Sequence, residues 1–178
     1  MKQLRIKMNK DLKLNIGITL WTLTSKEIRR FMRIWVQTLV PPAVTMTLYF
    51  VIFGSLIGPR IGEMDGFDYV QFMIPGLIMM SVITGSYANV VSSFYSVKFQ
   101  KSIEELLISP MPNWVILLGF ILGGVTRGIL VGIIVFCVSL FFYPEFQIAN
   151  IGLTITVLLL TSVLFALMGF INAVFADS

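Results

Sequence analysis

Few side chains in this 178-residue sequence could carry out chemistry on a substrate. It contains no His and a single Cys, Cys137, inside an apolar run. A disulfide within the chain is therefore impossible, and a Cys/His metal cluster has no ligands. The sequence also has no G-x-x-x-x-G-K-[ST] phosphate loop and no paired carboxylates within an apolar run. We predict no catalytic residue, no metal and no cofactor, and we interpret the chain as a non-enzyme.

Arg127 is the only charged residue in the long apolar run 106–144. An Arg inside a membrane segment is a functional-site hypothesis, because it can line a water-filled path or pair with a carboxylate. The expected cytoplasmic boundary of this segment, near residues 122–123, is only about one helical turn away. Its long stem could therefore reach cytoplasmic water. We favour this structural interpretation and keep the functional one open.

A second set of polar residues lies at helical spacing between residues 81 and 96. Small and polar side chains recur there at intervals of four and three, and they are Ser81, Gly85, Asn89, Ser92 and Ser96. Such a stripe faces protein or water in a bilayer. Ser81 and Asn89 are therefore candidates for lining a pathway or for bonding to neighbouring helices, and we favour helix packing.

The composition indicates an integral membrane protein. Apolar residues make up 57% of the chain and charged residues only 12%, against roughly 45–50% and about 25% in soluble domains. Nine of the 13 Lys and Arg residues precede Trp35. This distribution suits orientation in a membrane and contact with lipid headgroups, and it argues against a nucleic-acid partner.

The predicted fold is all-α, with one amphipathic helix and four transmembrane helices. Residues 1–17 form a basic arm, and 18–35 form an amphipathic helix in the membrane interface. Within it, Thr24 and Glu27 fit a capping box. Pro41 and Pro42 separate this helix from the first span or kink that span. The transmembrane domain, 36–178, has spans at about 36–57, 70–97, 115–142 and 151–175.

The distribution of Lys and Arg predicts the topology of these spans. Eleven basic residues lie in the amino-terminal arm and helix and in the insert between the second and third spans, while the two opposite loops contain only Arg60. The positive-inside rule then places the amino terminus, this insert and the carboxyl terminus in the cytoplasm.

The insert, residues 98–114, reads KFQKSIEELLISPMPNW and predicts a short amphipathic helix. Ile103, Leu106 and Leu107 share one face, Glu104 and Glu105 lie near its start, and two prolines follow it. A plain cytoplasmic connector and a docking element explain this pattern equally well.

Several segments, in this order, resemble the ABC-2 type transporter permease family, the membrane subunits of many bacterial exporters. They are FMRIWVQTLVPP, YFVIFG, QFMIPGLIMMSVITGSYANV, IEELLISPMP and GGVTRG. The resemblance covers nearly the whole chain. Such permeases usually have six spans, so the chain resembles a permease that lacks the last two.

The resemblance implies a location in the bacterial cytoplasmic (inner) membrane and a coupling helix at about 101–109 that docks a separate ABC ATPase. Lys101 and Ser109 would bound this contact, Ile103, Leu106 and Leu107 would anchor it, and Glu104 and Glu105 would set its polar register. A second permease copy or a related permease and membrane lipids would complete the assembly. The rival hypothesis is an inactive or regulatory fragment of such a permease. A channel or ion-coupled carrier lacks the membrane carboxylates it would need.

Overall fold

The computed structural model describes residues 16–64, 66–108, 111–144 and 150–176, except for the side chains of residues 63, 64, 67 and 105–107. Its elements, in chain order, are α2 (Ile16–Arg33), α3 (Trp35–Tyr49), the π-helix η1 (Phe50–Ile57), α4 (Gly58–Ile61), β1 (Glu63–Met64), β2 (Phe67–Asp68), α5 (Tyr69–Phe99), α6 (Ile103–Ile108), α7 (Asn113–Phe142) and α8 (Ile151–Phe175). The strands pair antiparallel, with Glu63 opposite Asp68.

Four helical segments are long and apolar enough to cross a membrane. They are Trp35–Ile61, Tyr69–Phe99, Asn113–Phe142 and Ile151–Phe175. This confirms the predicted class, a helical membrane protein with four candidate spans. The first span runs without interruption through α3, η1 and α4.

The break between α2 and the first span lies at Ile34, not at the two prolines. Ile34 has φ −114° and ψ 36°, outside helical geometry, whereas Pro41 and Pro42 lie inside α3. The first alternative, that the prolines separate the two helices, was therefore wrong, because the separation lies seven residues before Pro41. Proline is tolerated within a membrane helix when neighbouring groups satisfy the carbonyls that it leaves without donors.

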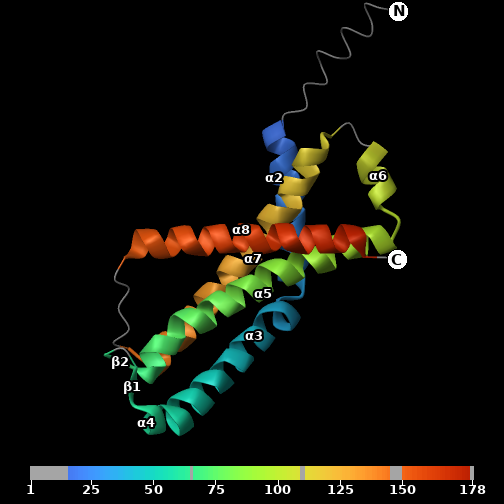
Figure 1. The fold of residues 1–178 in the computed structure, drawn as a ribbon. Helices are drawn as coiled ribbons and strands as arrows, with labels where there is room; N and C mark the ends of the chain where they lie inside the picture. Colours follow the sequence, from blue (N-terminus) through green and yellow to red (C-terminus); the bar gives the residue numbers. More distant parts are fainter. Residues whose placement is uncertain (1–15, 65, 109–110, 145–149, 177–178) are drawn as a thin grey trace, which may run out of the picture.

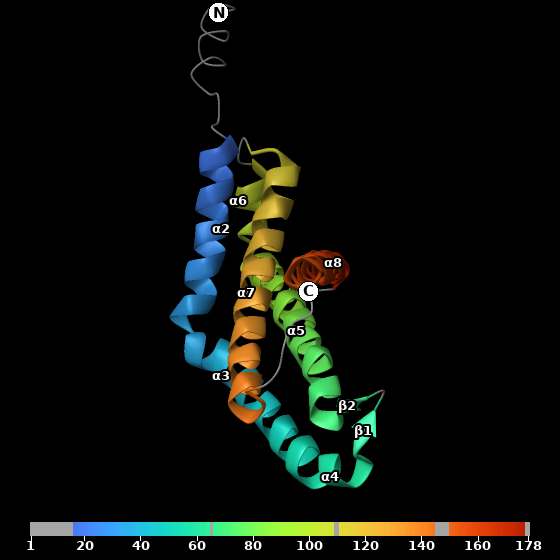
Figure 2. The same cartoon turned by 90° about the vertical axis from the view of Figure 1, so that its left-hand side faces the viewer.

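The centre of the molecule is formed by α5, α7 and α8. Helix α5 packs most extensively against α7 and α8, and Figure 2 views α8 nearly along its axis beside the other two. Aromatic contacts are prominent: the Phe94 ring meets Phe120 edge-on at 5.5 Å and lies 4.6 Å from Phe170. The buried core here is Val90, Phe94, Ile116, Phe120, Ile121, Val125, Ala166 and Ala173.

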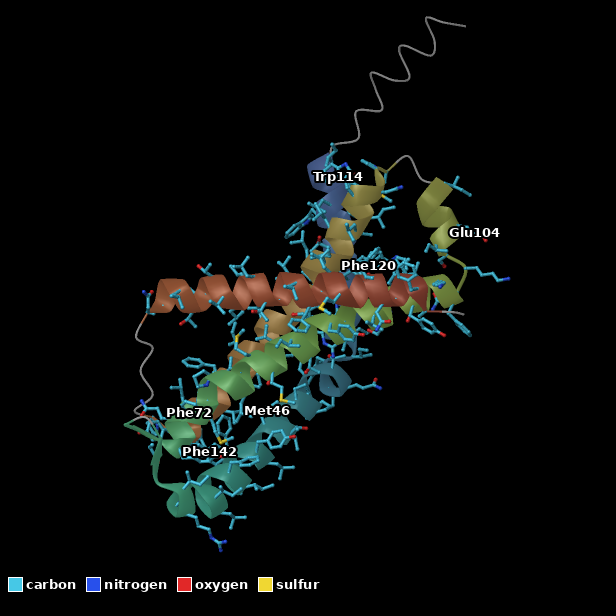
Figure 3. The ribbon with its side chains drawn as sticks, in the orientation of Figure 1. Met46, Phe72, Glu104, Trp114, Phe120 and Phe142 are labelled. Atoms are coloured by element: carbon cyan, nitrogen blue, oxygen red, sulfur yellow. The ribbon has the colours of Figure 1, made fainter. Side chains whose placement is uncertain are left out.

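A second apolar cluster joins the first span to α5 and α7. Its buried members are Met46, Phe50, Ile74, Leu77, Val131 and Val135. The rings of Phe50 and Phe142 stack with centroids 5.8 Å apart. Figure 3 shows Met46 and Phe142 in the part of the molecule nearer α4, and Phe120, which comes earlier in α7, in the part nearer α2.

The helices arrange the chain so that distant segments share an end. In Figure 1, α6 and the carboxyl-terminal end of α8 lie on the same side as α2, and α4 with β1 and β2 lies at the opposite end. A polar contact supports this arrangement, because the Lys98 Nζ at the end of α5 donates to the carbonyls of Val174 and Ala176.

Candidate functional site

Helix α2 packs closely along the amino-terminal half of α7, and two glycines permit the close approach. A Cβ added at Gly123 would lie 2.6 Å from the Cβ of Glu27, and one at Gly119 would overlap the side chain of Leu23. The buried face of α2 consists of Leu23, Thr24, Glu27 and Phe31. Because Thr24 and Glu27 lie in the middle of this helix, their interpretation as an amino-terminal capping box was wrong.

The glycines of α7 therefore serve two partners. Gly119 and Gly123 face α2, whereas Gly124, Gly128 and Gly132 face α5. At Gly128 an added Cβ would overlap the hydroxyl of Ser86 and lie 2.9 Å from the carbonyl oxygen of Val82. Small residues let helix backbones approach closely in lipid, where apolar side chains gain little by leaving the acyl chains.

A buried polar cluster ties α2 to α5. Glu27 is 2% exposed, and its Oε2 accepts a hydrogen bond from the Ser93 hydroxyl at 2.5 Å. The same oxygen forms an ion pair with Arg30 Nε at 3.3 Å. Arg30 Nη2 also donates to the backbone carbonyl and to the side-chain Oδ1 of Asn89, each at 3.1 Å. Four residues from two helices thus form one connected network.

This cluster satisfies a carboxylate that would otherwise be costly to bury. An isolated charge in an apolar environment shifts to its neutral form or finds a partner, and Glu27 has two. The Asn89 Nδ2 has no hydrogen-bond partner in the described part of the chain. The Glu27 carboxylate is therefore well paired, whereas the Asn89 side-chain amide donor is not used within the described residues.

Arg127 lies one turn beyond Gly123 and contacts the start of the first span. Its Nη2 donates to the carbonyl oxygen of Thr38 at 3.3 Å. In an α-helix this carbonyl would accept from residue 42, but Pro42 has no backbone N–H. Arg127 thus supplies the donor that Pro42 cannot. The sequence-based interpretation, in which the Arg127 stem reaches cytoplasmic water, did not include this contact with Thr38.

Arg127 is nevertheless incompletely satisfied. Its Nε is buried without a hydrogen-bond partner among the described residues. It also lies close enough to Arg30 for the two positive charges to repel each other. Asn89 and Arg127 therefore lie on either side of Arg30, which donates to Asn89 and repels Arg127.

Ser81 lies apart from these residues. Its hydroxyl donates to the carbonyl of Leu77 in its own helix at 2.8 Å. Gly85, the next member of the predicted stripe, packs against the backbone of Gly128. Beyond Asn89 the buried position is Ser93, whereas Ser92 is exposed. The polar stripe is thus a packing surface at its first two members and part of the cluster at Asn89.

Sequence reasoning missed Glu27, Arg30, Ser93 and Thr38 as members of this site. One signal was present, because Glu27 is the only carboxylate in α2 among four basic residues. Its partners could not be read from local spacing, since Asn89 and Ser93 lie about sixty residues further along the chain.

The predicted helix in the insert is observed as α6, which begins just after Lys101. Lys101 adopts a left-handed backbone with φ 57°, and this turn lets the chain change direction between α5 and α6. Ile103 is partly buried and packs against the core of α5, α7 and α8. Glu104 is exposed (Figure 3), and Ile108, one turn later, is 84% exposed. The side chains of Glu105, Leu106 and Leu107, like residue Ser109, lie outside the described part.

Comparison with known proteins places these features in context. The family described as ABC-2 type transporter matches residues 19–178. The inner membrane transport permease YadH of Escherichia coli (strain K12) is 60% identical over 161 residues, which are 90% of this chain and 62% of the relative. Proteins of the same name from Escherichia coli O157:H7 and Shigella flexneri match with the same values. The chain thus spans less than two thirds of the length of these relatives. No solved structure matches it.

Proposed function

The chain belongs to the ABC-2 type transporter family, and we propose that it acts as a permease subunit of an ATP-driven exporter in the bacterial inner membrane. Four candidate spans and relatives that are named inner membrane transport permeases support this proposal. ATP hydrolysis would belong to a separate ABC ATPase subunit. A second permease copy, or a related permease, would complete the pathway through the membrane.

The proposed ATPase contact is α6 with its flanks, residues 101–109. The observation that carries it is a short helix held between two spans, with Glu104 and Ile108 exposed one turn apart. The exposed Ile108 side chain offers apolar area that a docked partner could remove from water. Ile103 packs on the protein's own core, so we assign the outer contact to Lys101, Glu104 and Ile108, with Glu105, Leu106 and Leu107 completing the helix.

The proposed orientation has α2, α6 and the end of α8 in or near the cytoplasm. Basic residues are concentrated in α2, in the segment before it and at Lys98 and Lys101, as the positive-inside rule requires. Helix α6 connects directly to α5 and α7. A push on α6 by a closing ATPase would therefore reach the two spans that share the most extensive contacts, and the Glu27–Arg30 network would extend it to α2.

Cysteine crosslinking tests the proposed contact. The background variant Cys137→Ala removes the native thiol, which is exposed. In it, Ile108→Cys should crosslink to an ATPase co-expressed from the same gene neighbourhood. Ile61→Cys is the matched control, because Ile61 is also an exposed isoleucine but lies in α4 at the opposite end. Equal crosslinking of folded Ile108→Cys and Ile61→Cys variants would contradict the proposal.

A further inference from the structure

Helix α2 has three distinct faces, and among the described residues only one of them is covered by the rest of the protein. Successive residues of an α-helix are rotated by about 100°, so the 18 residues of α2 can be assigned to faces. The first, centred on Leu23 and Glu27, packs on α7. The second is apolar and exposed, with Ile18, Trp21 and Met32. The third is basic, and lies between the other two.

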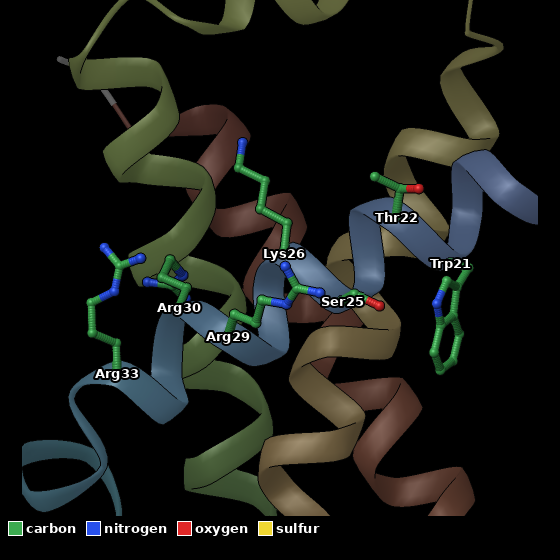
Figure 4. Close-up of a pocket in the computed structure, with 7 residues that line it drawn as sticks. All are labelled: Trp21, Thr22, Ser25, Lys26, Arg29, Arg30 and Arg33. Carbon is green, nitrogen blue, oxygen red and sulfur yellow. The ribbon is translucent and has the colours of Figure 1, made fainter.

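The basic face borders an open hollow of about 570 Å³ along α2. Its lining includes Trp21, Ser25, Lys26, Arg29, Arg30 and Arg33. Figure 4 shows the four cationic side chains along one side of α2, with Trp21 at the amino-terminal end of the row. Spacings of three and four place Lys26, Arg29 and Arg33 on neighbouring turns of one face. The hollow is open on one side, as expected for a surface site that meets a headgroup at the edge of a bilayer.

This face carries positive charge that the described part of the chain does not neutralise. Helix α2 has four basic residues and one carboxylate, Glu27. Glu27 is buried and already shared between Ser93 and Arg30, in the one ion pair found within the described ranges. Arg127 adds a further positive charge near Arg30. An anion bound here would offset this repulsion, most strongly where the site is partly shielded from water.

The neighbouring apolar face indicates which anion fits. Trp21 is 72% exposed and Ile18 is 62% exposed, and both border the basic row. A free phosphate ion would leave these side chains in water, and so would an acidic protein surface that contacted only the cations. A phospholipid offers a phosphate to the cations and acyl chains to the apolar residues. Helices with basic and aromatic faces bind membranes in this way.

We propose that the basic face of α2 binds the phosphate headgroup of an anionic phospholipid. The inference rests on the proposed function for placing α2 at the cytoplasmic leaflet. Arg29 and Arg33 make the main phosphate contacts, Lys26 adds charge, and Trp21 lies against the glycerol and upper acyl region. Arg30 joins this site to Glu27 and Asn89, so the bound lipid stabilises the contact between α2 and α5.

Quenching of Trp21 by brominated lipids tests the proposal on the full chain. In the variant Trp35→Phe/Trp114→Phe, Trp21 is the only tryptophan. We expect brominated phosphatidylglycerol, diluted into phosphatidylcholine vesicles, to quench Trp21 at a much lower mole fraction than brominated phosphatidylcholine does. Because each surface cation contributes on the order of a fivefold change in affinity for anionic lipid, Arg29→Gln should weaken this preference about fivefold and Arg29→Gln/Arg33→Gln about thirtyfold.

The matched control is Arg60→Gln, which removes one exposed arginine from α4 at the other end of the molecule. It should leave the preference unchanged. Helical content measured by circular dichroism reports whether each variant folds; Arg29 and Arg33 are exposed, and the single variants suffice if the double variant does not fold.

Three results would overturn the proposal. One is equal quenching by the two brominated lipids, and another is full preference in the folded Arg29→Gln variant. The third is displacement of the lipid by inorganic phosphate at matched ionic strength, which would indicate a site for a small anion only. If instead the Arg29→Gln/Arg33→Gln variant keeps its lipid preference but no longer co-purifies with an ATPase, the face docks protein. The quenching assay contains no ATPase. Its result therefore does not depend on whether Ile108→Cys crosslinks to an ATPase, and the two proposals can fail separately.

Discussion

The two halves of α7 contact the rest of the molecule through different chemistry. Its amino-terminal half meets α2 beside the Glu27–Arg30 ion pair and ends at the hydrogen bond from Arg127 to Thr38. Its carboxyl-terminal half contacts α3, η1 and α5 through apolar side chains, among them Val131 and Val135. Only the first half combines close helix approach with charged groups.

This difference predicts different responses to perturbation. The partners of a polar contact near a membrane surface can be replaced by water or headgroups, so the contact can open without unfolding the remainder. Apolar packing among spans depends on shape and dispersion, which lipid reproduces poorly once backbones lie close together. We therefore expect the α2 contact to open locally and the apolar contacts of α7 to fail together with the whole fold.

The largest effect is expected at the seam between α7 and α5. In Gly128→Leu the new side chain would overlap Ser86 and press on the backbone of Val82, which cannot move aside as a side chain can. Overpacking of this kind costs roughly 3 kcal/mol or more. We expect little folded protein, measured as the monodisperse fraction in detergent. Gly76→Ala is the control, because a Cβ there meets nothing within 4 Å; equal loss in both variants would contradict the close seam.

A smaller but still global effect is expected at the other apolar contact. Phe50 is buried and stacks on Phe142, and Phe50→Ala would leave a cavity between η1 and α7. We expect a loss of about 2 kcal/mol, below the roughly 3–5 kcal/mol usual for truncating a buried Phe to Ala, because lipid-facing neighbours can relax. The midpoint of thermal unfolding should fall, while hydrogen exchange of the α2 amides below the transition should stay as in the parent protein. Faster exchange confined to α2 would contradict the proposed division.

Loosening the contact of α2 should instead raise hydrogen exchange in α2 and leave the unfolding midpoint nearly unchanged. Glu27→Ala removes the acceptor of both Ser93 and Arg30. Arg30 is 31% exposed in its side chain and can turn to solvent, so we expect a cost of about 1–2 kcal/mol, below that of breaking a fully buried pair. Exchange of the α2 amides should rise several-fold with little change in the unfolding midpoint. Lys26→Ala, on the exposed basic face, is the control. In detergent without anionic lipid it should leave exchange unchanged.

Hydropathy and charge were enough to predict the parts of this fold that depend on the membrane itself. Four apolar stretches of membrane length, with Arg127 as the single charge within them, and a charged insert between two of them follow from the cost of burying charge in lipid. The observed spans begin and end within a few residues of those expected, except that the first continues through α4 to Ile61.

The tertiary partners of individual side chains could not be predicted in this way. Five glycines lie between residues 119 and 132. Their division between α2 and α5 depends on which helix lies on each side of α7, and spacing alone does not reveal it. Thr24 and Glu27 matched a local capping pattern, and tertiary burial overrode it. Pro41 and Pro42 were expected either to separate α2 from the first span or to kink that span. Local sequence could not show that Arg127, 89 residues beyond Thr38, donates to the Thr38 carbonyl and lets the helix continue through Pro42.

The smallest effect is expected at Arg127, although its position inside a span would suggest the largest. Arg127→Gln loses the hydrogen bond to Thr38, worth about 1 kcal/mol. It also removes a buried Nε that has no partner in the described chain, and the repulsion from Arg30. These contributions oppose each other, so the free energy of unfolding should change by less than about 0.5 kcal/mol. Arg127→Leu is the matched variant: it loses the same charge and the same hydrogen bond to Thr38 without bringing an amide into the span, so it should be no less stable than Arg127→Gln. If both variants unfold like the parent protein yet abolish ATP-dependent export by the complete transporter, Arg127 acts in the pathway; if export persists in Arg127→Gln, its role is to complete the helix that Pro42 interrupts.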